Sequence, residues 1–138
     1  MGVFVLGMHR SGTSAVTRAI NAFGVPLGNE ADVMPPAPDN PEGFAESLAL
    51  VDCNERLLRL LGSRWDAPPA LLPGWEHRSP VAIERDRAER TFRVVYAGEH
   101  WVWKDPRTCL TLPFWRRVLP ERPVAPTWIT RPPPALKT

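Results

Sequence analysis

The stretch that most constrains the fold of this chain is VFVLGMHRSGTS, from Val3 to Ser14. The residues before Gly7 are apolar and rich in Val and Phe, the pattern of a strand buried on both faces of a parallel sheet. Beyond Gly12, apolar residues recur at helical spacing until Gly24 ends the predicted helix. The apolar positions of this helix are Val16, Ala19, Ile20 and Phe23. We therefore expect a strand at Gly2 to Leu6, a glycine turn and a helix.

The glycine turn is suited to bind a tetrahedral anion. The first amides of a helix have no partner within it, and the helix dipole is positive at that end. The spacing of Gly7 and Gly12 is that of a Walker A loop, but Thr13 occupies the lysine position. Arg10 supplies a cation instead, and its planar guanidinium can contact two oxygens of a phosphate or sulfate without implying a metal. The residues predicted to bind the anion are His9, Arg10, Ser11, Gly12, Thr13 and Ser14.

Prolines divide the remainder of the chain. Most of the 17 prolines lie in residues 35–41, 68–80 and 120–134, which are typical of loops. Residues 25–43 form a long connection without periodicity, and a loop of that length is usually functional or disordered. Helices are predicted for residues 44–62 and, with Ser79 as the N-cap, up to Tyr96.

Two more strand patterns follow along the chain. Residues 100–104, HWVWK, predict a second buried strand, and residues 123–130, PVAPTWIT, a third, in which Pro126 removes one ladder hydrogen bond. A helix is expected to start near Thr108 and to be interrupted or begun afresh at Pro113. Strands alternating with helices predict one α/β domain over residues 1–138, a P-loop-like, three-layer fold with a short parallel sheet flanked by helices.

Charge and hydropathy exclude some classes of partner. A formal net charge of +2 without a long Lys/Arg block argues against nucleic acid. No apolar run approaches membrane-spanning length and the N-terminus lacks the pattern of a signal peptide, so we expect no membrane partner and a cytoplasmic location. Cys53 and Cys109 have no metal-ligand spacing and are expected to be free thiols.

Three motifs together point to a family. GMHRSGTS resembles the 5′-phosphosulfate loop of sulfotransferases, and DNPEGF with WKDPR is similar to the bacterial branch of that superfamily. The resemblance implies 3′-phosphoadenosine 5′-phosphosulfate (PAPS) as cosubstrate, no metal, and a hydroxyl or amine acceptor on a small molecule, glycan or peptide. It places Arg10 on the phosphosulfate. Lys104 of the Lys-Asp-Pro motif looks like the lysine that touches the transferring sulfuryl group in tyrosylprotein sulfotransferases, so Arg10 and Lys104 are the expected catalytic cations.

The acceptor must also lose a proton, usually to a carboxylate or a histidine. Glu30, Glu42, Glu46 and His9 are the options. Glu30 lies close to the place where tyrosylprotein sulfotransferases carry a catalytic glutamate, and Glu46 lies at the start of the second predicted helix, beside DNPEGF. We keep Glu30 and Glu46 as equal candidates for the base.

The resemblance covers the N-terminal half of a sulfotransferase domain. It implies that Arg131 binds the 3′-phosphate of PAPS, while the matching serine would fall one place past Thr138. Residues 120–138 form a proline-rich tail that is poorly suited to continue the sheet. We therefore expect a chain that is truncated at its C-terminus or shifted in reading frame.

Other interpretations of the same residues remain open. The loop could hold ATP in a small-molecule kinase or nucleotide-binding protein, although the Walker lysine is missing and only Asp105 could serve as a Walker B acid. The chain could also be a non-catalytic remnant. Arg107 could simply pair with Asp105, and Asn54 could face the site or cap a backbone group. Among the tryptophans, a core position is expected for Trp101, Trp103 and Trp115, whereas the loop residues Trp65 and Trp75 are candidates to line an acceptor pocket.

Overall fold

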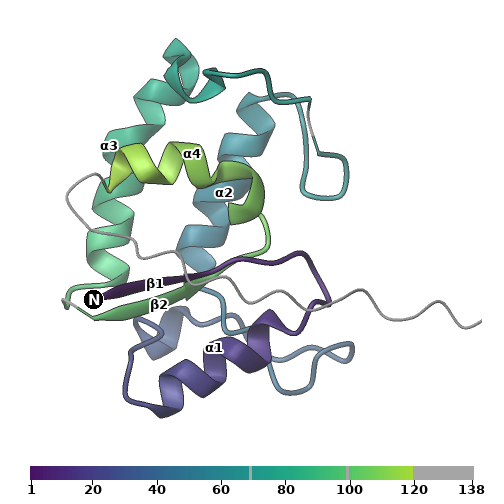
Figure 1. The fold of residues 1–138 in the computed structure, drawn as a ribbon, viewed down its shortest axis with the longest axis vertical. Helices are drawn as coiled ribbons and strands as arrows, with labels where there is room; N and C mark the ends of the chain where they lie inside the picture. The colour runs from purple at the N-terminus through teal and green to yellow at the C-terminus, as the bar shows by residue number, and fades with distance from the viewer. Residues whose placement is uncertain (69, 99, 120–138) are drawn as a thin grey trace, which may run out of the picture.

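The computed structural model describes residues 1–68, 70–98 and 100–119. Within them the chain forms a small α/β domain with four α-helices and a two-stranded parallel sheet (Figure 1). The strands are β1 (Gly2–Val5) and β2 (Trp101–Lys104). The helices are α1 (Thr13–Ala22), α2 (Leu48–Leu60), α3 (Ser79–Val95) and α4 (Thr108–Val118), and two short 3₁₀ turns are η1 (Glu30–Asp32) and η2 (Trp75–His77).

The sheet brings the two motif-bearing segments to one edge. β1 and β2 run parallel, with Gly2 opposite Trp101 and Val5 opposite Lys104. The carboxyl ends of parallel strands lie at the same edge, so the glycine loop and the segment after Lys104 leave the sheet side by side. A side chain at Gly2 would collide with the Trp101 ring, since an added Cβ would lie 2.1 Å from its Cζ2 atom. The predicted third strand, residues 123–130, lies outside the described residues.

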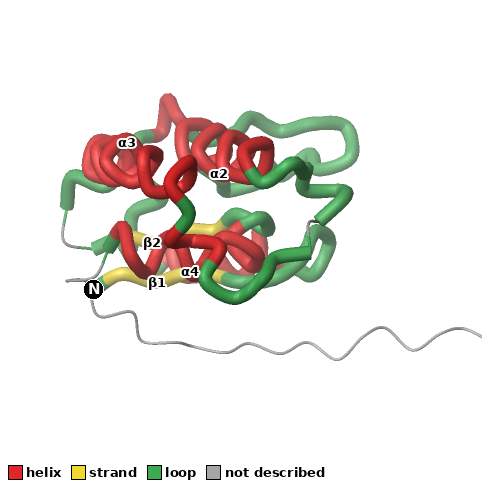
Figure 2. The backbone as a smooth tube through the Cα atoms, turned by 90° about the horizontal axis from the view of Figure 1, so that it is seen from above, coloured by secondary structure: helices red, strands yellow, loops and turns green. Residues whose placement is uncertain are grey.

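Helices lie on both sides of the strands. Figure 1 shows α1 below β1 and β2, with the other three helices above them. Figure 2 looks onto α2 and α3 from above, and these two helices pack against each other. Their inner faces, together with α4, enclose the core.

The core is aromatic. Trp101, Trp103 and Trp115 are at most 1% exposed, which confirms the prediction that they are core residues. The rings of Trp103 and Trp115 meet edge to face at 4.5 Å, and Phe92 of α3 lies 5.1 Å from the Trp101 ring. Such aromatic pairs contribute about 0.5–1.5 kcal/mol each beyond their buried area. Trp75 is also buried, so it belongs to the core and was wrongly considered for an acceptor pocket.

Helix α1 presents a different face from the one its apolar spacing predicts. Its buried residues are Thr13 and Thr17, whereas Ala19 is exposed and Phe23 is 89% exposed. The hydroxyl of Thr17 can be buried because it donates to the Thr13 carbonyl at 2.8 Å. Contact with the strands therefore decided the orientation of α1, in place of its hydrophobic pattern.

Three predicted helix details were wrong. Helix α2 starts at Leu48 and not at residue 44, because the Ser47 side chain caps it by accepting from the amide of Leu50. Ser79 is already inside α3, whose N-cap Arg78 makes no side-chain cap within the described chain. Helix α4 continues through Pro113 without a break. The tightly buried Phe114 and Trp115 hold the turn after that proline, so packing outweighs the lost hydrogen bond.

Asn54 joins three elements in the interior. It has no exposed surface, and its Nδ2 donates to Asp105 Oδ2 at 2.8 Å. Its Oδ1 accepts from the Thr111 hydroxyl at 2.7 Å and from Trp115 Nε1 at 2.8 Å. Asn54 therefore anchors α2 to α4 and to the segment that follows β2.

We expect Asn54→Ala to lower the free energy of unfolding by about 2–4 kcal/mol, because it leaves several buried polar groups without a partner. Urea unfolding of the variant beside the wild type measures this loss. Arg59→Ala, at an exposed position of the same helix, is the control and should stay within about 0.5 kcal/mol. A loss at Asn54 no larger than at Arg59 would contradict the anchoring role.

Candidate anion-binding site

The loop between β1 and α1 is closed by its own hydrogen bonds. The Met8 carbonyl accepts from the Ser11 amide at 3.2 Å and from the Ser11 hydroxyl at 2.6 Å. Gly12 has φ of 83°, which favours glycine. A side chain at Gly7 would meet Thr13 Cγ2 at 2.5 Å. Gly12 is therefore required by its backbone conformation, and Gly7 by the close approach of the Thr13 side chain.

The N-terminus of α1 presents open backbone donors. Within the described chain, no side chain caps this helix, and the amides of Gly12, Thr13 and Ser14 make no backbone hydrogen bond. The Ser14 hydroxyl is turned away from these amides and donates to the Phe44 carbonyl at 3.1 Å. The amides together with the positive end of the helix dipole form a place for an anion.

Helix α2 shows the opposite arrangement. Besides the Ser47 cap, Asp32 of η1 accepts from the Ala49 amide at 3.0 Å and from the Ser47 hydroxyl. The sequence did not predict that Asp32 caps α2, because Asp32 and Ala49 are far apart along the chain. η1 is also a 3₁₀ turn inside residues 25–43, a segment in which the sequence predicted no regular element.

The two basic side chains of the loop lie at the surface. Arg10 has a left-handed backbone, φ 65°, and a side chain that is 77% exposed. Its Nη1 donates to the Asp39 carbonyl at 3.1 Å, which joins the loop to the connection after α1. The exposed His9 places its ring 4.5 Å from the ring of Trp65. Trp65 therefore lies beside the loop.

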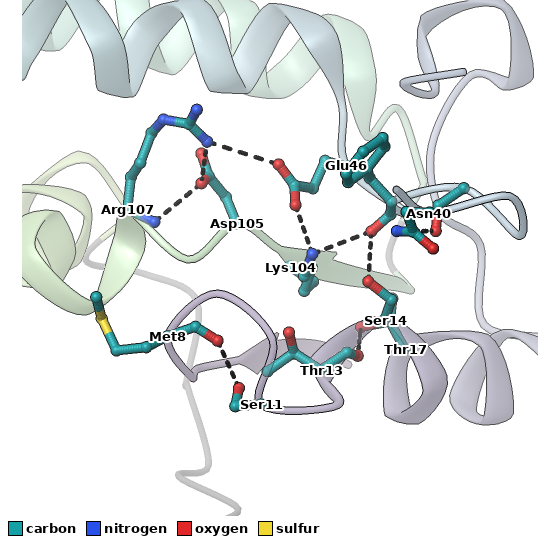
Figure 3. A network of polar contacts seen from close by, with 12 residues as sticks. Met8, Ser11, Thr13, Ser14, Thr17, Asn40, Glu46, Lys104, Asp105 and Arg107 are labelled. Atoms are coloured by element: carbon teal, nitrogen blue, oxygen red, sulfur yellow. Dashed lines mark hydrogen bonds and ion pairs between the residues drawn. The ribbon is translucent and has the colours of Figure 1, made fainter. Parts of the chain in front are cut away.

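Lys104 lies at the centre of the charged groups in Figure 3. Only 4% of its side chain is exposed, and its Nζ donates to Glu46 Oε1 and, at 3.1 Å, to the Phe44 carbonyl. The same carbonyl accepts from the Ser14 hydroxyl. One backbone oxygen thus links the N-terminus of α1 to the tip of β2.

Arg107 contacts three carboxylates. Its Nη1 lies 3.0 Å from Asp105 Oδ1 and 3.6 Å from Glu46 Oε2, and its Nε donates to Glu55. The pairing with Asp105 was anticipated, and the contacts with Glu46 and Glu55 were not. Lys104 and Arg107 face three carboxylates, which leaves one negative charge in excess before the loop is counted.

Burial shifts two ionisable groups of the site. Burial raises the pKa of Glu46, while the hydrogen bond from Lys104 opposes that rise. Burial lowers the pKa of the His9 imidazole from its usual 6.5, and the positive charge of Arg107 lowers it further. Asp105, Lys104 and Glu55 also act electrostatically on His9, so this ring faces the charged network.

The structure brings some of the predicted site residues together and separates others. Glu46 and Lys104 are in direct contact beside the glycine loop. Glu30 is exposed on η1, and Glu42 pairs with Arg18 of α1. Arg131, the residue expected to bind a 3′-phosphate, lies outside the described residues.

Ala45 has a strained backbone in the middle of this site. Its φ of 55° is left-handed, a conformation that costs a non-glycine residue about 1–2 kcal/mol. On either side of Ala45, the Phe44 carbonyl and the Glu46 carboxylate both contact Lys104. The unusual turn therefore aims two acceptors at one ammonium group, and sequence patterns carry no signal for it.

Comparisons of the chain with models of protein families, with curated proteins and with solved structures found no match. In the part of the chain that the structure describes, no helix is long and apolar enough to cross a membrane. Cys53 and Cys109 are free thiols, as expected.

We expect Ala45→Gly to raise the free energy of unfolding by up to about 1 kcal/mol, because glycine adopts a left-handed backbone without strain. Ala49→Gly in α2 is the matched control and should lower it by about 1 kcal/mol. Urea unfolding of both variants checks the difference. Losses of equal size at the two positions would contradict the strain at Ala45.

The lowered pKa of His9 predicts a pH effect on stability. In the unfolded chain His9 takes up its proton at higher pH than in the folded protein, so its contribution to stability is lost as the pH falls below about 6.5. Between about pH 7 and pH 5, the wild type should therefore lose more unfolding free energy than His9→Gln. Parallel pH profiles of the two proteins in chemical unfolding would refute this.

Proposed function

We propose that this chain is a sulfotransferase-like domain with a P-loop-like fold, built to move a sulfuryl group from PAPS to a hydroxyl or amine acceptor. The observation that carries the proposal is the place of Lys104. Its ammonium group lies at the tip of β2, on a carbonyl shared with Ser14 at the open N-terminus of α1. Two cations, Arg10 and Lys104, and a set of backbone donors lie at one edge of the sheet. This arrangement suits a ligand group with several anionic oxygens.

The residues present fit the phosphosulfate end of PAPS. The amides of Gly12, Thr13 and Ser14 suit the 5′-phosphate, and Arg10 at the loop surface suits its outer oxygens. Lys104 is placed to meet the sulfuryl side. The partner expected for the 3′-phosphate, Arg131, is not among the described residues, so this half of the fit stays a prediction.

The chemistry asked of the protein is electrostatic. Bound PAPS supplies an activated sulfuryl group, which passes to the acceptor oxygen or nitrogen as its bond to the phosphate oxygen breaks. Negative charge grows on that bridging oxygen, and fixed cations stabilise it more in the transition state than in the ground state. Lys104 is suited to this role because its neighbours already hold it in place. The acceptor's proton passes to a base, for which Glu30, Glu42, Glu46 and His9 are the options.

The kinase alternative has less support from the site. A Walker B acid must offer its carboxylate to Mg²⁺. Asp105 is 1% exposed and already holds Asn54 Nδ2 and Arg107 Nη1. These contacts favour a structural role for Asp105 and leave the loop without its acid. A cytoplasmic location is also part of the proposal.

Calorimetric titration with 3′-phosphoadenosine 5′-phosphate (PAP), beside AMP and Mg-ATP, tests the function directly. We expect selective binding of PAP. Preference for Mg-ATP would support the kinase alternative, and binding of none of the three would support the non-catalytic remnant. In either case the sulfotransferase proposal would be wrong.

We expect Arg10→Ala to weaken PAP binding by about 1.5–3 kcal/mol, the range for a hydrogen bond with a charged partner. Arg90→Ala, at an exposed position of α3, is the control for the loss of one positive charge. It should change the dissociation constant by less than about twofold because surface charges are screened. Equal constants for wild type and Arg10→Ala would remove Arg10 from the site.

A further inference from the structure

The ammonium group of Lys104 is fixed by two acceptors. A lysine ammonium has three N–H donors. One is used by Glu46 Oε1 and one by the Phe44 carbonyl, and among the described residues no acceptor takes the third. In the view of Figure 3, Glu46 lies on one side of Lys104 and the loop with Ser11 and Thr13 on the other. The third donor is therefore left for a group outside the described residues.

Glu46 is poorly placed to take a proton from an acceptor. Its Oε1 accepts from Lys104, and its Oε2 lies 3.6 Å from Arg107 Nη1. A general base must reach the proton that it removes, directly or through one water. Oε1 is instead held by Lys104, and Oε2 faces Arg107 in an ion pair inside the protein.

We propose that Glu46 is a positioning residue, which together with the Phe44 carbonyl holds Lys104 so that its third N–H meets the sulfuryl group of the donor. This inference rests on the proposed function and deepens it, because it assigns the two cation-bound oxygens of Glu46 a role other than base catalysis. It leaves Glu30, Glu42 and His9 as the candidates for the proton acceptor.

The geometry around Phe44 makes this positioning specific. The Phe44 carbonyl accepts from both Lys104 and Ser14, so the ammonium and the first turn of α1 are tied to one atom. The left-handed backbone of Ala45 lets the adjacent carbonyl and carboxylate reach the same ammonium. A shift of the Glu46 carboxylate should therefore move Lys104 relative to an anion on α1 without changing the net charge.

The decisive variant is Glu46→Asp, which keeps the charge and withdraws the carboxylate by one carbon. Glu55→Asp is the matched control. It shortens a carboxylate of the same network by one carbon, but that carboxylate pairs with Arg107 and not with Lys104. Glu46→Gln is a second variant that keeps the length and removes the charge. Thermal unfolding verifies that each variant is folded, and calorimetry measures the dissociation constants of PAPS and PAP.

We expect Glu46→Asp and Glu46→Gln to weaken PAPS binding about tenfold and PAP binding less than about threefold, because PAP lacks the sulfuryl group that Lys104 meets. Glu55→Asp should stay within about twofold for both nucleotides. Wild-type affinity for PAPS in Glu46→Asp, or an equal loss in Glu55→Asp, would overturn the positioning role while leaving the proposed function intact. Failure of the wild type to bind either nucleotide would overturn both.

A spectroscopic readout separates positioning from a general loss of structure. The chain has only two lysines, Lys104 and Lys137, so ¹⁵N-lysine labelling in a Lys137→Arg background reports on Lys104 alone. PAPS should shift the ammonium signal in the wild type and in Glu55→Asp. In Glu46→Asp the signal should already be displaced before PAPS is added. An unchanged signal in that variant would show that Glu46 does not position Lys104.

Discussion

The structure around the site depends on how a buried lysine is neutralised. An ammonium group that is 4% exposed is costly unless it is paired and hydrogen-bonded, and Glu46 and the Phe44 carbonyl meet both needs for Lys104. To do so, the segment before α2 must turn sharply, which explains a left-handed alanine at position 45. The same turn brings a carbonyl to Ser14 and so holds α1 beside the tip of β2.

A second buried network supports the first from behind. Asn54 fixes Asp105 and, through Thr111 and Trp115, the first turns of α4. Asp105 in turn pairs with Arg107, and Arg107 also contacts the Glu46 carboxylate, at the oxygen that Lys104 does not bind. The charged groups of the site and the groups that hold the fold therefore form one network, which lies against the closely packed aromatic core.

Much of the local structure could be predicted because neighbouring residues decide it. The strand before Gly7, the buried WVWK strand and the tryptophans of the core follow from short-range patterns, and the structure confirms them. The predictions failed where distant residues compete. Packing kept α4 continuous through Pro113 and turned the predicted apolar face of α1 away from the core. Helix α2 begins four residues later than predicted because Ser47 and the distant Asp32 cap it.

By itself, the sequence determined which groups reach the end of the sheet. It set the glycines of the loop and the basic residues Arg10 and Lys104, because a strand followed by a tight turn leaves little choice of place. Only the tertiary structure decided what those groups face. That Lys104 meets Glu46 and Phe44, and that Arg107 meets Glu46 and Glu55, depends on contacts between residues about fifty or more positions apart, which no local pattern encodes.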